Sequence, residues 1–287
     1  VGKYIMSKQE FIQKRRSFIF CPGNKPDMIP KALRSGADMV CIDLEDAIIP
    51  EHKDISRVST VKAFENISVP YGVETLIRIN DVNSEEGKED IQAILNSNNT
   101  ASGLMLPKIQ SVEEIINLER QIKLANKSLN LHIIIETNTG LQNAWNIAQS
   151  SSIIKSLLFG GVDMSADLGC NGDWLSLLYA RSRVVHAAAG AGIDSIDVPF
   201  LDLEDMEGMR NEAQKSKNLG FSGKGSIHPK QIESLNKVFT PSSEEIAYAN
   251  KVIKAFNEAS DGLVVVDGKL IEKPVLRTAL KTIANSN

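Results

Sequence analysis

The stretch HIIIETNTGLQNAW, residues 132–145, joins an apolar run to a segment with helical spacing. The run HIIIE at 132–136 has the length and the β-branched content of a buried strand. It ends in a carboxylate, Glu136, and the small polar loop that follows contains a glycine. A carboxylate at the end of a buried strand is a helix cap, a salt-bridge partner or a ligand, and the rest of the chain decides between these.

The alternation of strand and helix continues on both sides of this stretch. Short β-branched runs alternate with segments of helical period, which favours βα units and a parallel sheet. Eight strands are predicted, at residues 17–20, 39–43, 75–79, 103–107, 132–136, 156–160, 194–198 and 224–228.

Amphipathic helices fit between these strands, and each begins near a Ser, Asp, Asn or Pro, as helix starts prefer. Eight alternations without a break in composition predict an α/β fold, a (βα)₈ TIM barrel over residues 15–240, with an open doubly wound sheet as the alternative. The predicted helices span residues 26–35, 53–65, 85–96, 111–127, 141–149, 174–189, 205–219 and 229–238.

Residues 241–287 differ in character from the repeating units. A helix at 243–259 is followed by two apolar runs that Asp267-Gly268 joins, and a final helix spans 275–285. Asp-Gly between apolar runs is the strongest short-range hairpin signal. Because an isolated hairpin is marginally stable, we expect this helix–hairpin–helix extension to pack as a lid on its own barrel or on a neighbouring subunit.

The composition of the 287 residues, 42% hydrophobic and 24% charged, is typical of a globular protein. A net charge of −4 argues against nucleic acid or an anionic membrane as the main partner. The apolar runs fall short of the about 18 residues that a membrane helix needs. Cys21, Cys41 and Cys170 lack Cys-x-x-Cys spacing, which indicates reduced thiols. We therefore expect a cytoplasmic protein without a nucleic-acid or membrane partner.

Polar residues gather where the predicted strands end, which is where parallel barrels carry their active sites. Several carboxylates that converge there need a cation, and oxygen ligands with few cysteines or histidines indicate Mg²⁺. Glu136 and Asp163, on neighbouring strands, form the best pair; the alternative is that each caps the following helix or pairs with Arg78. The polar strand ends are Asp43–Asp46, Arg78, Asn80, Lys108, Glu136, Asp163, Asp197 and His228.

Two further segments suggest ligand binding. Arg16, Lys25 and Lys31 surround a Pro-Gly turn and a helix start, which suits an anion such as phosphate; the alternative is a solvated basic helix face. In GFSGKGSIHPKQI, His228 and Pro229 begin a helix, and a lone histidine in such a place is more often a structural hydrogen-bonding residue than a catalyst.

An ordered set of motifs from about residue 15 to residue 240 resembles the citrate lyase β-subunit-like branch of the HpcH/HpaI aldolase/citrate lyase superfamily, which includes malyl-CoA and citramalyl-CoA lyases. The hairpin segment VVVDGKLIE matches further on. The motifs are RRSFIFCPGNKPDMIPKAL, ADMVCIDLEDAI, IRIN, LPKI, IIIETNTGL, LLFGGVDMSADLG, IDVPFLDLEDMEG and GFSGKGSIHPKQI.

The resemblance implies a (βα)₈ barrel in which Glu136 and Asp163 hold Mg²⁺ and the backbone of Val162 lies beside the metal ligand. Arg78 would bind the carboxylate of the keto-acid part of the substrate. The resemblance also places Coenzyme A against the FCPGNK and IHP segments, which nominates Phe20, Lys25, Lys31, Ile227 and His228.

The implied activity is that of a Mg²⁺-dependent carbon–carbon lyase, which cleaves a short 3-hydroxyacyl-CoA to acetyl-CoA and an α-keto acid, in a homotrimer or hexamer. Lyases of this family share a C-terminal G-[KR]-x-[IV]-D segment whose aspartate reaches the site of an adjacent subunit as an acid/base. Here GKLIE puts Glu272 in that place, which keeps the carboxylate but adds a methylene.

Two other functions stay open. The first is an aldolase for a free hydroxy-keto acid, against which the basic residues Arg16, Lys25 and Lys31 speak, since such a substrate has no nucleotide phosphates. The second is a non-catalytic, complex-forming subunit, against which Glu136, Asp163 and Arg78 together speak, since a structural barrel has no need of all three. The acyl group, of citramalyl, malyl or citryl type, and its carrier, CoA or another protein, also stay open.

Overall fold

The computed structural model describes residues 13–65, 67–259 and 264–286. They form two compact units, one of residues 15–237 and a smaller one that consists mainly of residues from 238 onward.

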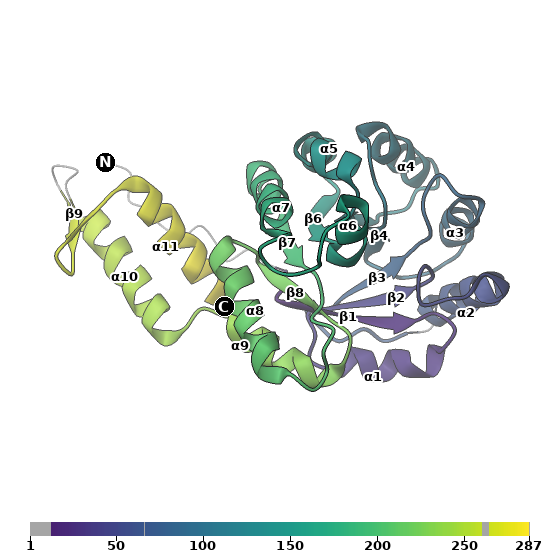
Figure 1. The fold of residues 1–287 in the computed structure, drawn as a ribbon, viewed down its shortest axis with the longest axis horizontal. Helices are drawn as coiled ribbons and strands as arrows, with labels where there is room; N and C mark the ends of the chain where they lie inside the picture. The colour runs from purple at the N-terminus through teal and green to yellow at the C-terminus, as the bar shows by residue number, and fades with distance from the viewer. Residues whose placement is uncertain (1–12, 66, 260–263, 287) are drawn as a thin grey trace. The chain divides into compact units, whose positions relative to one another are not determined.

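The larger unit is a closed barrel of eight parallel strands, in which β1 pairs with both β2 and β8 (Figure 1). The predicted TIM barrel is confirmed, and the alternative of an open sheet is wrong, because no strand of this sheet is left at an edge. The strands are β1 Ser17–Pro22, β2 Met39–Asp43, β3 Glu74–Arg78, β4 Gly103–Leu106, β5 Asn130–Ile135, β6 Ile154–Phe159, β7 Asp194–Asp197 and β8 Gly223–Ser226.

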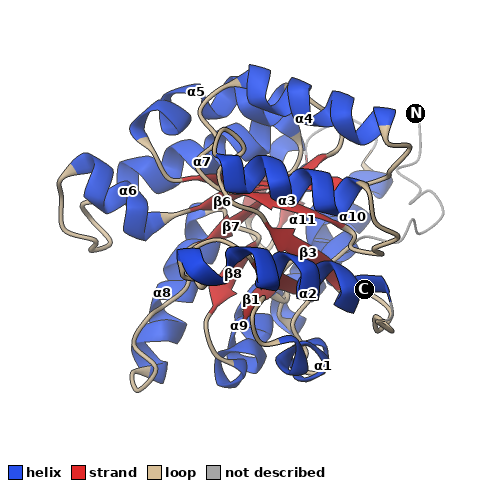
Figure 2. Cartoon of the chain, turned by 90° about the vertical axis from the view of Figure 1, so that its right-hand side faces the viewer, coloured by secondary structure: helices blue, strands red, loops and turns tan. Residues whose placement is uncertain are grey.

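Helices surround the strands (Figure 2) and follow them in the order that the alternating pattern predicts. Short 3₁₀ turns at Pro26–Met28, Pro50–His52 and Pro229–Gln231 lead into α1, α2 and α9, each with the proline at its start. The helices are α1 Ile29–Leu33, α2 Lys53–Glu65, α3 Glu85–Leu95, α4 Val112–Leu124, α5 Asn138–Gln149, α6 Gly161–Leu168, α7 Leu178–Ala191, α8 Met206–Leu219 and α9 Ile232–Phe239.

Between β5 and β7, two predicted helices begin at other residues, and a third helix is present that the sequence did not predict. α5 begins at Asn138 and not at residue 141, because Thr137 caps it by accepting a hydrogen bond from the N–H of Gly140. α7 begins at Leu178 and not at residue 174. The extra helix α6, directly after β6, was not predicted at all, and it carries one of the predicted metal ligands.

Side chains that point into the barrel form layers along each strand. On β3, the alternating residues Glu74, Leu76 and Arg78 run from the amino end to the carboxyl end, and Leu76 belongs to the apolar middle layer. The barrel interior is therefore apolar in the middle and polar at both ends. The middle layer consists of Phe18, Met39, Cys41, Leu76, Met105, Ile134, Leu158 and Ile196.

A charged cluster fills the amino end of the interior. Nε and Nη2 of Arg15 donate to the two carboxylate oxygens of Glu74 at 2.6 and 3.1 Å, and Nη1 donates to Asp194 at 2.9 Å. The ring of His132 lies 3.3 Å from Glu74 through Nε2, within ion-pair distance but without a hydrogen bond, and its Nδ1 bonds to Ser156 at 2.8 Å. Buried charges at this end are thus paired with opposite charges.

The smaller unit contains helices α10 and α11 and a two-stranded antiparallel sheet, so the predicted helix–hairpin–helix extension is confirmed as a fold. Asp267 and Gly268 both have positive φ, 49° and 76°, as a tight hairpin turn requires. Its role as a lid stays a prediction. The elements are α10 Ser243–Glu258, β9 Val264–Val266, β10 Lys269–Ile271 and α11 Lys273–Ser286.

Two further expectations concern the cysteines and membrane-spanning helices. All three cysteines are free thiols, as predicted. Within the described ranges, no helix combines the length and the apolar character that crossing a bilayer requires.

Candidate active site

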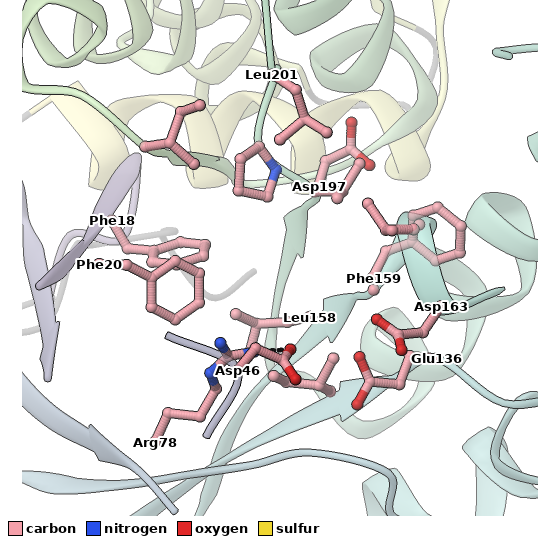
Figure 3. A pocket seen from close by; sticks show the side chains of 17 residues that line it. Phe18, Phe20, Asp46, Arg78, Glu136, Leu158, Phe159, Asp163, Asp197 and Leu201 are labelled. Atoms are coloured by element: carbon pink, nitrogen blue, oxygen red, sulfur yellow. Dashed lines mark hydrogen bonds and ion pairs between the residues drawn. The ribbon is translucent and has the colours of Figure 1, made fainter. Parts of the chain in front are cut away.

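A cavity of about 280 Å³ lies at the carboxyl ends of the barrel strands (Figure 3). This is the position at which TIM barrels carry their active sites. Its walls come from β1, β3, β5, β6 and β7 and from the segments that follow β2, β5, β6, β7 and β8. The lining residues are Phe18, Phe20, Asp46, Arg78, Ile134, Glu136, Leu158, Phe159, Gly160, Gly161, Val162, Asp163, Asp197, Val198, Pro199, Leu201 and Ile227.

Glu136 follows the last residue of β5 and is 4% exposed. Its Oε1 accepts a hydrogen bond of 2.8 Å from the backbone N–H of Lys108. It does not cap α5, because Thr137 is the capping residue. Burial, followed by the charges of Asp163 and Glu45, raises the pKa of Glu136 to about 8. A buried carboxylate among like charges is stabilised by a cation.

Asp163 lies in the first turn of α6, and its carboxyl group and that of Glu136 are turned toward each other in Figure 3. Gly160, which precedes α6, lets the two elements approach. A Cβ at Gly160 would lie 2.5 Å from the Cβ of Glu136 and 2.6 Å from its Oε2, closer than atoms can come. Val162, also in this turn, is 57% exposed and lines the cavity.

Arg78, at the end of β3, is held by carboxylates of the β2 end. Its Nε and Nη2 donate to the two oxygens of Asp43, each at 2.7 Å, and its Nη1 lies 2.9 Å from Glu45 and 3.3 Å from Asp46. Burial lowers the pKa of Arg78, but these carboxylates outweigh burial and raise it. The guanidinium also stands 4.6 Å from the centre of the Phe20 ring. Its orientation is therefore fixed.

Lys108 connects the two acidic groups of the mouth. Its backbone N–H binds Glu136, as described, while its ammonium group forms an ion pair with Glu45. Its φ of 56° lies in the left-handed region, which is uncommon for a residue other than glycine. Sequence reasoning named Asp43, Glu45 and Lys108 as polar strand ends but did not include them in the site, although this signal was available for all three.

Glu136 and Asp163 together fit a hard divalent cation. In the part of the chain that the structure describes, neither forms an ion pair with Arg78, so the alternative that Arg78 neutralises them is wrong. No group of three or more His, Cys, Asp or Glu side chains suited to a metal occurs among the described residues. Two carboxylates are the typical protein share of a Mg²⁺ site, whose other ligands are water and substrate oxygens.

The residues predicted to bind Coenzyme A are only partly brought together. Phe20 and Ile227 line the cavity. Lys25 and Lys31 do not line it; both are exposed, at the turn after β1 and in α1. His228 is exposed, and its Nδ1 accepts a hydrogen bond of 3.1 Å from the N–H of Lys230, so it caps the turn that leads into α9.

Two other sequence interpretations are corrected. Arg16 does not join Lys25 in a basic cluster, because it precedes β1 whereas Lys25 follows it, and it forms an ion pair with Asp38 at 2.7 Å. Asp197 does line the cavity, as a polar strand end should, but the interpretation of its carboxylate as a free group of the mouth is corrected. It accepts from Lys224 at 2.8 Å and from Arg181 at 3.0 Å, in a buried cluster.

Glu272, the predicted acid/base residue, belongs to the smaller unit. It lies between β10 and α11, is exposed, and its carbonyl oxygen accepts from the N–H of Val275 at 2.9 Å. Its role at the cavity stays a prediction.

A model of the HpcH/HpaI aldolase/citrate lyase family matches residues 16–229, which include all eight strands of the barrel. The chain therefore belongs to this family, and the predicted membership is confirmed.

The chain is similar to two named proteins over nearly its full length. It is 35% identical to the citrate lyase subunit beta of Leuconostoc mesenteroides subsp. cremoris, covering 95% of this chain and 94% of that protein. It is 31% identical to the mitochondrial citramalyl-CoA lyase of Homo sapiens, covering 94% of this chain and 84% of that protein. Among solved structures, the protein CitE from Mycobacterium tuberculosis in complex with magnesium, acetoacetate and coenzyme A has a TM-score of 0.79 at 27% identity, covering 94% of this chain and 97% of that one.

Proposed function

We propose that this protein is a Mg²⁺-dependent carbon–carbon lyase that cleaves a short 3-hydroxyacyl-CoA of the citramalyl, malyl or citryl type to acetyl-CoA and an α-keto acid. The observation that carries this proposal is the pair of facing carboxylates, Glu136 and Asp163, at the mouth of the barrel. The relatives named as citrate lyase and citramalyl-CoA lyase, and the related structure with magnesium and coenzyme A, support it.

Glu136 and Asp163 are the residues that would hold Mg²⁺. The ion would supply Lewis-acid stabilisation of negative charge that develops on oxygen during cleavage. In the overall reaction, the bond between C2 and C3 of the hydroxyacyl group breaks, and its electron pair forms the enolate of acetyl-CoA. The hydroxyl on C3 loses its proton and becomes the carbonyl group of the keto acid, while C2 gains a proton, so no oxidant or reductant is needed.

Arg78 is suited to orient the carboxylate of the keto-acid part. Asp43 holds the guanidinium by two hydrogen bonds, which come from Nε and Nη2. The remaining nitrogen, Nη1, donates to Asp46. Asp46 is the most distant of the three carboxylates and its side chain is 60% exposed. A substrate carboxylate would take its place at Nη1, and a fixed guanidinium gives such a contact a defined direction.

The nucleotide part of CoA would lie toward the outside of the barrel. Phe20 and Ile227 at the cavity mark its inner end, and the exposed ammonium groups of Lys25 and Lys31 suit the phosphates. His228 would contribute through the turn that it caps. These assignments, Glu272 as the acid/base from an adjacent subunit, the homotrimer or hexamer and the cytoplasmic location all remain predictions.

Incubation with Mg²⁺ and a panel of hydroxyacyl-CoA thioesters tests the proposal, with pyruvate, glyoxylate and oxaloacetate identified as products. We expect cleavage with at least one thioester and its loss in Glu136→Ala. Lys123→Met, which removes an exposed ion pair on α4, is the control and should retain activity. Unchanged metal binding and cleavage in Glu136→Ala would refute the lyase proposal.

The two other functions predict different results from the same panel. An aldolase would cleave free hydroxy-keto acids in preference to thioesters. A complex-forming subunit would cleave neither.

A further inference from the structure

The charges around the cavity are predominantly negative. Among the described residues that line it, Arg78 is the one cation, against the carboxylates Asp46, Glu136, Asp163 and Asp197. Arg78 is already paired with Asp43, Glu45 and Asp46. One substrate carboxylate can replace Asp46 at Nη1, but Asp43 and Glu45 still compensate the charge of this guanidinium, so a second carboxylate would find no uncompensated cation.

The nearest other cations are also occupied. The ammonium group of Lys108 is paired with Glu45. Lys224, behind the β7 wall, is fully buried, and its Nζ donates to Asp197, to Glu212 and to the carbonyl of Val198, at 2.8, 2.8 and 2.7 Å. An ammonium group has three donors, so Lys224 has none left for a substrate.

The rest of the cavity wall is apolar and held in place. Phe18, Ile134 and Leu158 come from the barrel layer, and Val198 and Pro199 follow β7. The bond from Lys224 holds the carbonyl of Val198 away from the cavity's other polar groups, so this carbonyl is engaged and the side chains that face the cavity here are apolar. A carboxylate against such a wall would lose its hydration without gaining a partner.

From these contacts we infer that the keto-acid half of the substrate carries a single carboxylate and a small apolar substituent, as pyruvate does, and not the second carboxylate of oxaloacetate. This inference rests on the proposed function and narrows it to thioesters of the citramalyl type. A methyl group would lie against the apolar wall, and its absence, as in glyoxylate, would forfeit that contact.

The test compares citramalyl-CoA, malyl-CoA and citryl-CoA at equal Mg²⁺ by kcat/KM, with each keto acid identified. We expect citramalyl-CoA to exceed malyl-CoA by about tenfold, the contribution of one methyl contact. It should exceed citryl-CoA by at least about 100-fold, because of the unpaired carboxylate. A citryl-CoA value equal to or above that of citramalyl-CoA would overturn the inference while leaving the lyase function intact.

Binding of the free keto acids gives a second readout that does not depend on turnover. In the presence of Mg²⁺ and CoA, calorimetry should show tighter binding of pyruvate than of freshly prepared oxaloacetate. If no thioester is cleaved, the proposed function fails, and this ratio still decides the inference, since tighter binding of oxaloacetate contradicts it.

A charge variant tests the physical cause. Leu201 lines the cavity and is 58% exposed, so Leu201→Arg adds a cation at the rim without disturbing the core. We expect it to raise kcat/KM for citryl-CoA relative to citramalyl-CoA. Leu175→Arg, at a 78% exposed leucine outside the cavity lining, is the matched control. An equal shift in both variants, or none in Leu201→Arg, would refute the charge argument.

Discussion

The two ends of the barrel interior each contain a buried glutamate, but the neighbours of these two glutamates carry opposite charges. At the amino end, Glu74 is 4% exposed and receives two hydrogen bonds from Arg15, with His132 beside it. Burial alone would raise the pKa of Glu74, but the contacts with His132 and Arg15 outweigh it and lower the pKa to about 2.

At the carboxyl end, Glu136 is equally buried, but its neighbours Asp163 and Glu45 are acidic, and its pKa is raised to about 8. Two glutamates of equal burial thus differ in their pKa because of their partners. At the amino end the charges compensate one another, so that removing one of them destabilises the fold. At the carboxyl end, surplus negative charge creates the place for a cation and costs stability in its absence.

Removing the carboxylate at the amino end should have the largest effect on stability. Glu74→Ala leaves the buried guanidinium of Arg15 without its bidentate partner, and breaking a buried pair in this way costs about 3–5 kcal/mol. Urea unfolding measures the change. Glu85→Ala, which removes an exposed pair with Lys88, should change stability by less than about 1 kcal/mol. Similar losses in both variants would contradict the account of the amino end.

In the unmodified protein, the pair of Glu74 and Arg15 should make the free energy of unfolding depend on pH in the acid range. Because the folded pKa of Glu74 lies near 2, below its ordinary value of 4.5, the stability that it contributes is present above pH 4.5 and is lost as the pH falls toward 2. The shift corresponds to about 3 kcal/mol. Unfolding free energies measured between pH 5 and pH 2.5 should fall less steeply in Glu74→Gln than in the unmodified protein. Identical slopes would show that Glu74 is not the responsible group.

At the carboxyl end, Glu136→Gln should separate function from stability. We expect Mg²⁺ affinity to fall by at least about 100-fold, near 3 kcal/mol, because one of two carboxylate ligands is lost. The metal-free variant should be at least as stable as the parent, since a neutral amide relieves the repulsion from Asp163. Calorimetric titration and thermal unfolding with a chelator measure the two quantities. A large loss of metal-free stability would mean that Glu136 is a structural residue.

A smaller effect on activity is expected from a substitution that crowds Glu136. Gly160→Ala places a Cβ 2.5 Å from that of Glu136, so the carboxylate must move, and we expect about a tenfold loss of kcat/KM. In Gly172→Ala, the new Cβ would come no closer than 3.7 Å to its neighbours, so this variant is the control. Equal activities of the two alanine variants would show that the approach at Gly160 is not critical.

The barrel could be predicted from the sequence because most strands are short apolar runs, and because several of the helices that follow begin at a polar capping residue. α6 was missed because GVDMSADL has eight residues and follows Gly160, which provides no side-chain cap. Its local signal lies at the other end, where Gly169 closes the helix in the left-handed conformation.

The sequence predicts which residues lie at the carboxyl ends of the strands, but not which partners these residues bind. The sequence placed Glu136, Asp163 and Arg78 at one mouth, and the cavity contains all three. That Arg78 binds Asp43, whereas Lys108 binds Glu45, depends on how neighbouring strands are aligned, which a single sequence does not show. Arg16 was assigned to the wrong end because only eight residues lie between it and Lys25, but six of these eight form the strand β1 and carry the chain from one end of the barrel to the other.

The backbone of Lys108 narrows what evolution can place at this position. A φ of 56° suits glycine, but glycine lacks the ammonium group that reaches Glu45. A β-branched residue would be strained by the same backbone angle and would also lack the charge. Two requirements therefore limit which residue can stand at position 108: it must tolerate a positive φ, and it must carry a positive charge toward Glu45.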